Sequence, residues 1–235
     1  MGAMTPDYDN DPQRWRSWRA PRDVHEIVAP ELIGPVLDVG CGDGRLASLR
    51  NPAVSWIGLD SSPAQLESNP YRPVVRADMR RLPFRDAVFA EVTHLWCLYH
   101  IEDPVVAVRE AWRVLRPGGR YYACTAARNN DPEIMWEGYP PTTFDAEEAG
   151  AIVGSVFDHV EVQGWDERFF PLQTREEVRA YCRHNYIPTA RAETAELPLW
   201  LTKRGVLVRA TKQEVRRHGH VRKSEKGQIL DHVCG

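Results

Sequence analysis

Cysteine pairs and clustered metal ligands are both missing from this sequence. Its 235 residues include 5 cysteines, and no two of them form a C-x-x-C motif. Small secreted proteins held by disulfides are rich in cysteine, and structural zinc sites need closely spaced ligands. The histidines of the run His218-Gly219-His220 stand in a basic tail and make a poor metal site. We therefore expect reduced, packed thiols and no metal ion.

Long apolar runs and a strong excess of one charge are also lacking. No stretch reaches the roughly 18 apolar residues that a membrane-spanning helix needs. The first residues lack the apolar core of a signal peptide, so we expect a cytoplasmic protein without membrane contact. Lysine and arginine number 30 against 33 aspartates and glutamates, which gives a formal net charge of −3. That balance provides no long-range attraction for nucleic acid. The sequence does not determine the oligomeric state.

The chain does contain a large apolar fraction, 43% of its residues, and 8 tryptophans. Short apolar segments at about 36–39, 54–59, 74–75, 88–98 and 120–125 alternate with helical patterns. Alternation of this kind predicts one α/β domain, with parallel strands and helices on both faces of the sheet. Ligands of such sheets bind beyond the carboxyl ends of the strands, so those positions are where we look for chemistry.

The clearest helical pattern covers residues 104–115. Asp103 can cap it, Pro104 suits its first turn, and the run Pro117-Gly118-Gly119 ends it. Four apolar residues are expected to form its buried face, namely Val105, Val108, Trp112 and Leu115. On the same reasoning Trp56 and Trp112 belong to the core, whereas Trp165 and Trp200 border later strands and their role is undecided.

The last third of the chain has a different organisation. Helices are expected at about 143–153 and 174–184, the second opened by the capping box of Thr174 and Glu177. Residues 160–170 and 205–210 are expected to be extended, and 191–198 to form a loop. The basic segment from Lys212 onward is expected to be a solvated end.

The strongest signal is a glycine-rich turn directly after the first apolar segment. Gly40, Gly42 and Gly44 alternate and a helical pattern follows, so the loop either binds a ligand closely or merely connects two elements. Its G-x-G-x-G spacing differs from the G-x-G-x-x-G of dinucleotide-binding folds, which disfavours a nicotinamide oxidoreductase. The acidic Asp38 before the glycines suits a ligand that carries positive charge.

Two more acids follow the next two apolar segments. Asp60 can accept hydrogen bonds from ribose hydroxyls, or it can cap the helix that starts near Pro63. Asp78 can accept a hydrogen bond from the exocyclic amine of adenine, or it is an ordinary loop residue. The three acids together favour an adenosine-containing ligand with a cationic group.

The chain resembles class I S-adenosylmethionine-dependent methyltransferases in five runs of sequence. They are LDVGCGDGRLA, WIGLDSSPAQL, ADMRRLPFRDAVFAEV, LYHIEDP and EAWRVLRPGGRYY. The resemblance covers about 36–122 and is greatest to the small-molecule group that includes the ubiquinone and menaquinone C-methyltransferases. It implies a Rossmann-like, seven-stranded, mostly parallel sheet whose last strand is antiparallel. It also implies the cofactor S-adenosylmethionine, released as S-adenosylhomocysteine.

The resemblance assigns cofactor contacts residue by residue. It implies that Asp38, Gly40 and Gly42 contact the methionine end, that Asp60 contacts the ribose, and that Asp78 and Met79 contact the adenine. Ser61 would lie beside the ribose or the adenine. The chain departs from the family at Ala90, where an aspartate is usual. It also departs at 93–96, which read Thr-His-Leu-Trp in place of small or amide residues.

Methyl transfer from a sulfonium is an in-line displacement that depends chiefly on alignment of the acceptor. A base helps some acceptors, and His94 and His100 are the candidates, although both can equally be structural histidines. His94 and Tyr99 are also expected beside the cofactor, with Tyr99 shaping the pocket of its methionine end.

The acceptor site is expected to be lined by aromatic side chains. Related enzymes use the N-terminal segment as a lid, so we expect residues 1–30 to be a lid or a surface helix, 31–211 the methyltransferase domain with cap-like helices, and 212–235 a tail. The candidate acceptor contacts are Tyr8, Trp15, Trp18, Trp96, Trp136 and Tyr139. The hypothesis is transfer to an O, N or C atom of a small organic molecule such as a secondary metabolite. Methylation of RNA and a non-catalytic cofactor-binding role are the alternatives.

Overall fold

The computed structural model describes residues 23–136 and 141–213, except for the side chain of Phe170. Its strands are β1 (Val36–Val39), β2 (Trp56–Asp60), β3 (Val74–Arg76), β4 (Phe89–Leu95), β5 (Leu115–Ala126), β6 (His159–Leu172) and β7 (Leu199–Thr211). Its helices are α2 (Val24–Val28), α3 (Arg45–Leu49), α4 (Pro63–Ser68), α5 (Pro104–Val114), α6 (Ala146–Gly154), α7 (Arg175–His184) and α8 (Ala190–Thr194). Two short 3-10 helices, η1 (Ala29–Glu31) and η2 (Leu98–His100), complete the described part.

Within the described residues the strands form one seven-stranded sheet in the order β3-β2-β1-β4-β5-β7-β6. The pairs from β3 to β5 are parallel, and β7 lies antiparallel to both β5 and β6. The expected α/β fold with an antiparallel last strand is therefore confirmed. The strand order reverses between β1 and β4, so the carboxyl ends of these two strands mark the place where such sheets bind ligands.

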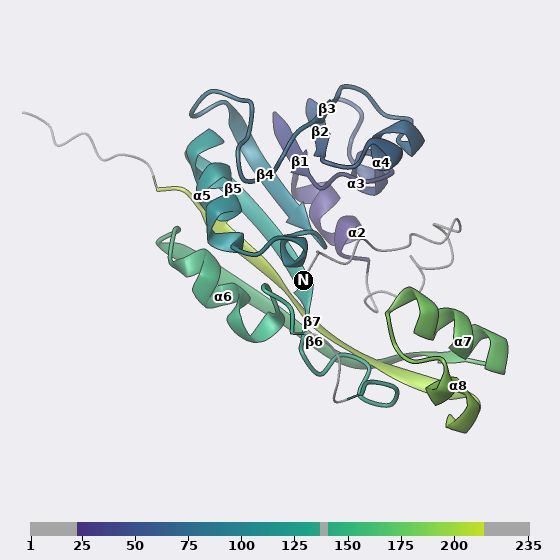
Figure 1. Cartoon of the computed structure of the whole chain (residues 1–235). Coiled ribbons are helices and arrows are strands. Elements are labelled where there is room, and N and C mark those ends of the chain that lie inside the picture. Colours follow the sequence, from purple (N-terminus) through teal and green to yellow (C-terminus); the bar gives the residue numbers. More distant parts are fainter. Residues whose placement is uncertain (1–22, 137–140, 214–235) are drawn as a thin grey trace, which may run out of the picture.

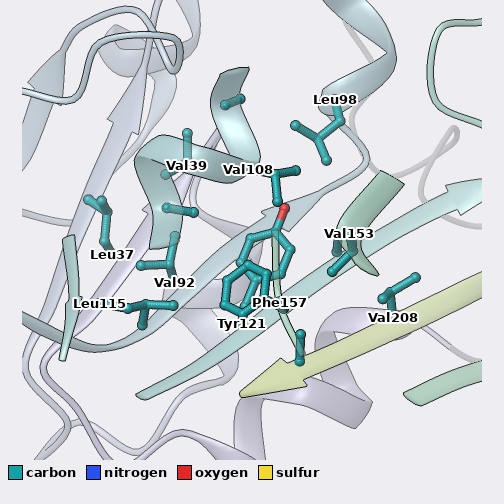
Figure 2. Packing of buried hydrophobic residues seen from close by; sticks show 14 of the residues in the cluster. Leu37, Val39, Val92, Leu98, Val108, Leu115, Tyr121, Val153, Phe157 and Val208 are labelled. Atoms are coloured by element: carbon teal, nitrogen blue, oxygen red, sulfur yellow. The ribbon is translucent and has the colours of Figure 1, made fainter. Parts of the chain in front are cut away.

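Helices cover both faces of the sheet (Figure 1). On one face α2 and α3 bury residues such as Val28 and Leu46 in a cluster with Trp56. On the other face α5 and α6 pack over a cluster that contains Val92 and Tyr121. Figure 2 shows the rings of Tyr121 and Phe157 lying against each other in this second cluster, with centroids 5.1 Å apart. Each of the central strands is consequently buried on both sides.

Helix α5 begins as expected, because the Asp103 side chain accepts a hydrogen bond from the Val105 amide at 3.0 Å. The expected buried face is wrong at Trp112, whose side chain is 42% exposed. The core instead receives Pro104, Ala107, Val108, Ala111 and Val114. The apolar stripe is thus rotated so that small residues face the tightly packed sheet and the bulky indole lies at its margin.

Beyond the sheet, β6 and β7 continue as a long hairpin that carries α7 and α8 (Figure 1). The Thr174–Glu177 capping box is present at the start of α7. The loop expected over 191–198 is wrong in part, because residues 190–194 form α8 and β7 already starts at Leu199. We call this extension, formed by α7, α8 and the adjoining ends of β6 and β7, the arm.

The two helices expected as caps differ in position. Helix α6 packs on the sheet, where Ala149 and Val153 join the same cluster as Tyr121. Helix α7 instead packs in the arm, in a separate cluster that includes Val178 and Leu201. None of the helices in the described ranges is long and apolar enough to cross a membrane.

Candidate functional site

The loop from β1 to α3 is shaped by its glycines. Gly40, Gly42 and Gly44 have φ angles of +71°, +50° and +87°, which side chains rarely tolerate. A Cβ atom on Gly40 would lie 2.6 Å from the Cβ of Cys97, so this position lacks space as well. The Gly40 and Cys41 amides donate to the Leu59 carbonyl at 2.7 and 3.0 Å, which ties the loop to β2. The glycines therefore allow a tight turn that packs against Cys97 at the carboxyl edge.

Asp38 is buried near the end of β1 with an exposed fraction of 3%. Its carboxylate accepts from the Thr93 hydroxyl at 2.7 Å and from the Trp56 indole nitrogen at 3.4 Å. Burial raises its pKa, against the hydrogen bonds of Thr93 and Trp56, which lower it. Because both donors are uncharged, the carboxylate would gain from a cationic group brought to this edge.

Asp60 joins β2 to the glycine loop. One carboxylate oxygen accepts from the Gly42 amide at 3.0 Å, and the other accepts from the Ser62 amide at 2.9 Å. The cap of α4 is Ser62, which accepts from the Gln65 amide, so Asp60 supports the turn before the helix without capping it. This carboxylate lies at the strand end, half-buried and in contact with the loop.

Asn69 belongs to the site although no motif in the sequence indicated it. It is buried, and its side-chain amide donates to the Gly42 carbonyl at 2.9 Å. Its side-chain oxygen accepts from the Tyr71 amide at 2.9 Å. Asn69 precedes Pro70 and suggests only a turn. The contact with Gly42 arises because α4 folds back onto the loop.

The charged residues Asp78 and Arg80, which follow β3, are exposed to solvent. Asp78 pairs with Arg80, with a distance of 2.6 Å between Oδ2 and Nη2. The hydrogen bond from the Arg80 side chain lowers the pKa of Asp78. Met79 is half-buried against the core, and Ser61, after β2, is exposed. Asp78 is therefore charged and available at the edge, with Arg80 as a partner that sequence reasoning missed.

His94 does not match its expected role as a base. Its side chain has an exposed fraction of 0% and lies on the α5 and α6 side of β4. Its Nδ1 atom is 3.1 Å from the Tyr121 hydroxyl, and within the described part of the chain Nε2 has no hydrogen-bond partner. Burial lowers its pKa to about 3. A neutral imidazole enclosed in this way is poorly placed to take a proton from an acceptor or to contact the cofactor.

The other expected pocket residues are dispersed. His100 is exposed in η2, and its ring lies 4.5 Å from that of the half-buried Tyr99. Trp96 follows β4 and packs edge to face with Trp165 of β6. Trp136 follows β5 and is 36% exposed. Tyr8, Trp15, Trp18 and Tyr139 lie outside the described residues.

Residues 37–123 match the family model described as methyltransferase domain. Over these residues the chain is similar to methyltransferase domains. The matched region extends from β1 to β5, so it includes the glycine loop, Asp38 and Asp60. The methyl donor of such domains is S-adenosylmethionine, the cofactor that the sequence predicts.

Two relatives that match this region have names that refer to quinones. The demethylmenaquinone methyltransferase of Streptomyces griseus subsp. griseus is 45% identical over 138 residues, which cover 54% of this chain and 59% of that protein. The ubiquinone biosynthesis O-methyltransferase of Pseudomonas savastanoi pv. phaseolicola is 36% identical over 107 residues, which cover 40% of this chain and 45% of that protein. The chain thus spans about half the length of the curated relatives it matches.

The fold is shared more widely than the sequence. The YcgJ protein from Bacillus subtilis superimposes with a TM-score of 0.58 at 19% identity, over 81% of this chain and 97% of that one. The match therefore extends past residue 123 and supports the common fold of the matched region and the strands that follow it.

Proposed function

We propose that this chain transfers the methyl group of S-adenosylmethionine to a small organic acceptor. The observation that carries the proposal is the buried Asp38 carboxylate, held by neutral donors beside three glycines with positive φ. Together they offer a negative charge and a tight turn free of bulky side chains at its glycines, at the carboxyl edge where the sheet order reverses. The edge therefore suits a ligand that joins a cationic amino acid to a nucleoside.

The contacts follow from the position of each residue. Asp38 would attract the ammonium group, and the backbone of Gly40 and Gly42 would allow the methionine portion to approach closely. Asp60 would accept from the ribose hydroxyls, since its carboxylate already lies against the loop. Ser61, Met79 and the charged Asp78 would line the adenine side, at the ends of β2 and β3.

The bound cofactor supplies an electrophilic methyl group on a sulfonium. The chain's own task is to align the acceptor atom, whether O, N or C, with that group and to exclude water. Alignment alone contributes up to about 7–11 kcal/mol in favourable reactions, so transfer does not require a positioned base. This agrees with the burial of His94, and it leaves the exposed His100 as the remaining base candidate.

We further propose that the acceptor is related to a quinone or quinol. The names of the relatives from Streptomyces griseus and Pseudomonas savastanoi support this class of acceptor. In the domain division that we propose, 31–211 is the methyltransferase unit; most of the other two expected parts, 1–30 and 212–235, lies outside the described residues. A cytoplasmic location stays a prediction.

Calorimetric titration tests the binding assignments, with 5′-methylthioadenosine as a matched ligand that lacks the amino-acid portion. We expect Asp38→Asn to weaken S-adenosylhomocysteine binding about tenfold, near 1.4 kcal/mol, and to leave 5′-methylthioadenosine binding unchanged. Asp60→Asn should weaken both ligands, because both contain the ribose. Equal losses for both ligands in Asp38→Asn would assign Asp38 a purely structural role.

A second measurement tests the activity. The wild-type chain is incubated with radiolabelled S-adenosylmethionine and a panel of quinols, phenols, amines and carboxylic acids. Transfer to a quinol or phenol is the expected result. Binding of NAD in preference to S-adenosylmethionine would contradict the proposed function.

A further inference from the structure

Trp96 adopts a backbone conformation that a bulky residue rarely takes. Its φ angle is +61°, at the position directly after β4. Left-handed geometry is unfavourable for side chains with a Cβ, and residues held in it concentrate at functional sites. Its amide still donates to the Cys124 carbonyl of β5 at 3.3 Å, so the conformation is anchored within the sheet. The fold therefore maintains a conformation that is unfavourable for tryptophan.

The left-handed turn determines which face of the sheet receives the indole. Successive side chains of a strand point to opposite faces, so Trp96 would ordinarily point away from the side of Leu95. Both residues instead pack into the cluster on the α2 and α3 face, which also contains Trp56, the partner of Asp38. The turn thus brings Trp96 to the same face as the proposed cofactor site.

A second indole meets Trp96 there. The ring of Trp165 lies 6.1 Å from that of Trp96, with the planes inclined by 61°. Trp165 is opposite Gly205 of β7, and Gly205 is opposite Ala126, the last residue of β5. The two half-buried rings therefore span the carboxyl end of β5, next to β4, which ends directly before Trp96.

Gly205 leaves the space that the Trp165 ring occupies. A Cβ atom at Gly205 would lie 2.3 Å from Cζ2 of Trp165 and 2.5 Å from the Thr125 carbonyl oxygen. The Trp165 ring therefore rests directly on the glycine backbone, and any other residue would displace it. The Trp165 ring is held against Gly205 of β7, and the Trp96 ring is positioned by the left-handed turn after β4. The two rings are therefore held by different strands.

We propose that Trp96 and Trp165 form an aromatic platform that binds a planar, aromatic acceptor ring. Inclined indoles present both a face and an edge, which are the surfaces that stack with or pack edge-on against another ring. The platform discriminates planar rings from saturated ones of the same size. This inference rests on the proposed function only for the transfer step, since ring recognition can be measured without it.

The test compares 2-naphthol with decahydro-2-naphthol, its saturated counterpart, by calorimetry in the presence of saturating S-adenosylhomocysteine. We expect the wild-type chain to bind the aromatic alcohol about five- to tenfold more tightly. Trp165→Phe should retain the preference, because a ring remains, whereas Trp165→Leu and Trp96→Leu should lose it. Trp200→Leu is the matched control, since Trp200 is 37% exposed on β7 and its ring lies under Arg168.

Equal binding of the two alcohols by the wild-type chain, or an unchanged preference in both leucine variants, would overturn the platform. Unmeasurable binding of 2-naphthol to the wild type would do the same. S-adenosylhomocysteine affinity is measured on the same samples. Its loss from the wild type, with the preference for 2-naphthol retained when the titration is repeated without cofactor, would reject the proposed function and keep the platform. Circular dichroism melting confirms that each variant folds.

Discussion

His94 shows at the scale of one residue how burial turns a candidate base into a structural group. Its pKa falls from 6.5 to about 3 because the folded chain excludes water from the ring. The unfolded chain therefore binds a proton below pH 6.5 that the folded chain does not take up. We expect the free energy of unfolding to decrease by about 1.4 kcal/mol for each pH unit by which the pH falls from 6.5 to about 3.

Urea denaturation from pH 7 to pH 4 measures this slope. His94→Asn retains an acceptor for the Tyr121 hydroxyl and does not titrate, so the variant should show a flatter profile. His100→Asn is the matched control for replacement of a histidine at an exposed position. An identical slope in wild type and His94→Asn would show that other groups cause the acid sensitivity.

The site residues divide by whether their contacts are local in sequence. The glycine loop with Asp38 and Asp60 was predictable, because the turn and the strand-end acids are written in consecutive residues. Asn69 and Thr93 were not, because their bonds to Gly42 and Asp38 join segments 27 and 55 residues apart. A pattern with a period of two or 3.6 residues carries no information about such pairs.

At the scale of the element, α5 shows the same limit. Its cap and its end were predicted from Asp103 and from the glycines near 118, which act locally. Its buried face was wrong at Trp112, because a helix of this composition offers two apolar stripes and the packing of the sheet decides between them. Lys212 was expected in a solvated tail, but it is buried against the end of this helix.

Lys212 stabilises the carboxyl end of α5. Its ammonium group donates to the Trp112 and Leu115 carbonyls, both at 2.8 Å, and lies 3.8 Å from the centroid of the Trp112 ring. We expect Lys212→Met to lower the free energy of unfolding by about 1.5–3 kcal/mol, as for lost hydrogen bonds to a charged group. Urea denaturation measures the change. Arg116→Met, at an exposed position of the same turn, should change it by less than about 0.5 kcal/mol.

At the scale of the whole molecule, the arm has its own core, and a buried ion pair joins it to the segment after β5. The arm cluster shares no residue with the two clusters that sandwich the sheet. Lys203 of β7 donates to the Asp131 carboxylate at 2.9 Å and to the Tyr181 hydroxyl at 2.6 Å, and the Tyr181 hydroxyl donates to the same carboxylate. Burial raises the pKa of Asp131 and lowers that of Lys203.

The ion pair fastens the segment after β5 to the arm. The Asp131 amide donates to the Thr202 carbonyl at 2.9 Å, and Arg191 donates to the Ile134 carbonyl at 2.8 Å. The segment that leads to Trp136 is thus joined to β7 and α8, whereas the glycine loop belongs to the sheet. The segment that carries Trp136, a candidate acceptor contact, and the glycine loop therefore have separate supports in the fold.

Removal of Lys203 distinguishes these two supports. Lys203→Met leaves the Asp131 carboxylate buried without its cation, a change that costs about 3–5 kcal/mol in other proteins. We expect hydrogen exchange to accelerate in α7, α8 and 129–136, while β1, β4 and β5 keep their protection. The double variant Asp131→Asn with Lys203→Met removes both charges and should recover most of the protection. Because the cofactor side rests on the sheet, S-adenosylhomocysteine affinity should stay within about twofold in both variants. A uniform loss of protection across the sheet and the arm would instead show that the two fold as one unit, so that changes in the arm would reach the cofactor site.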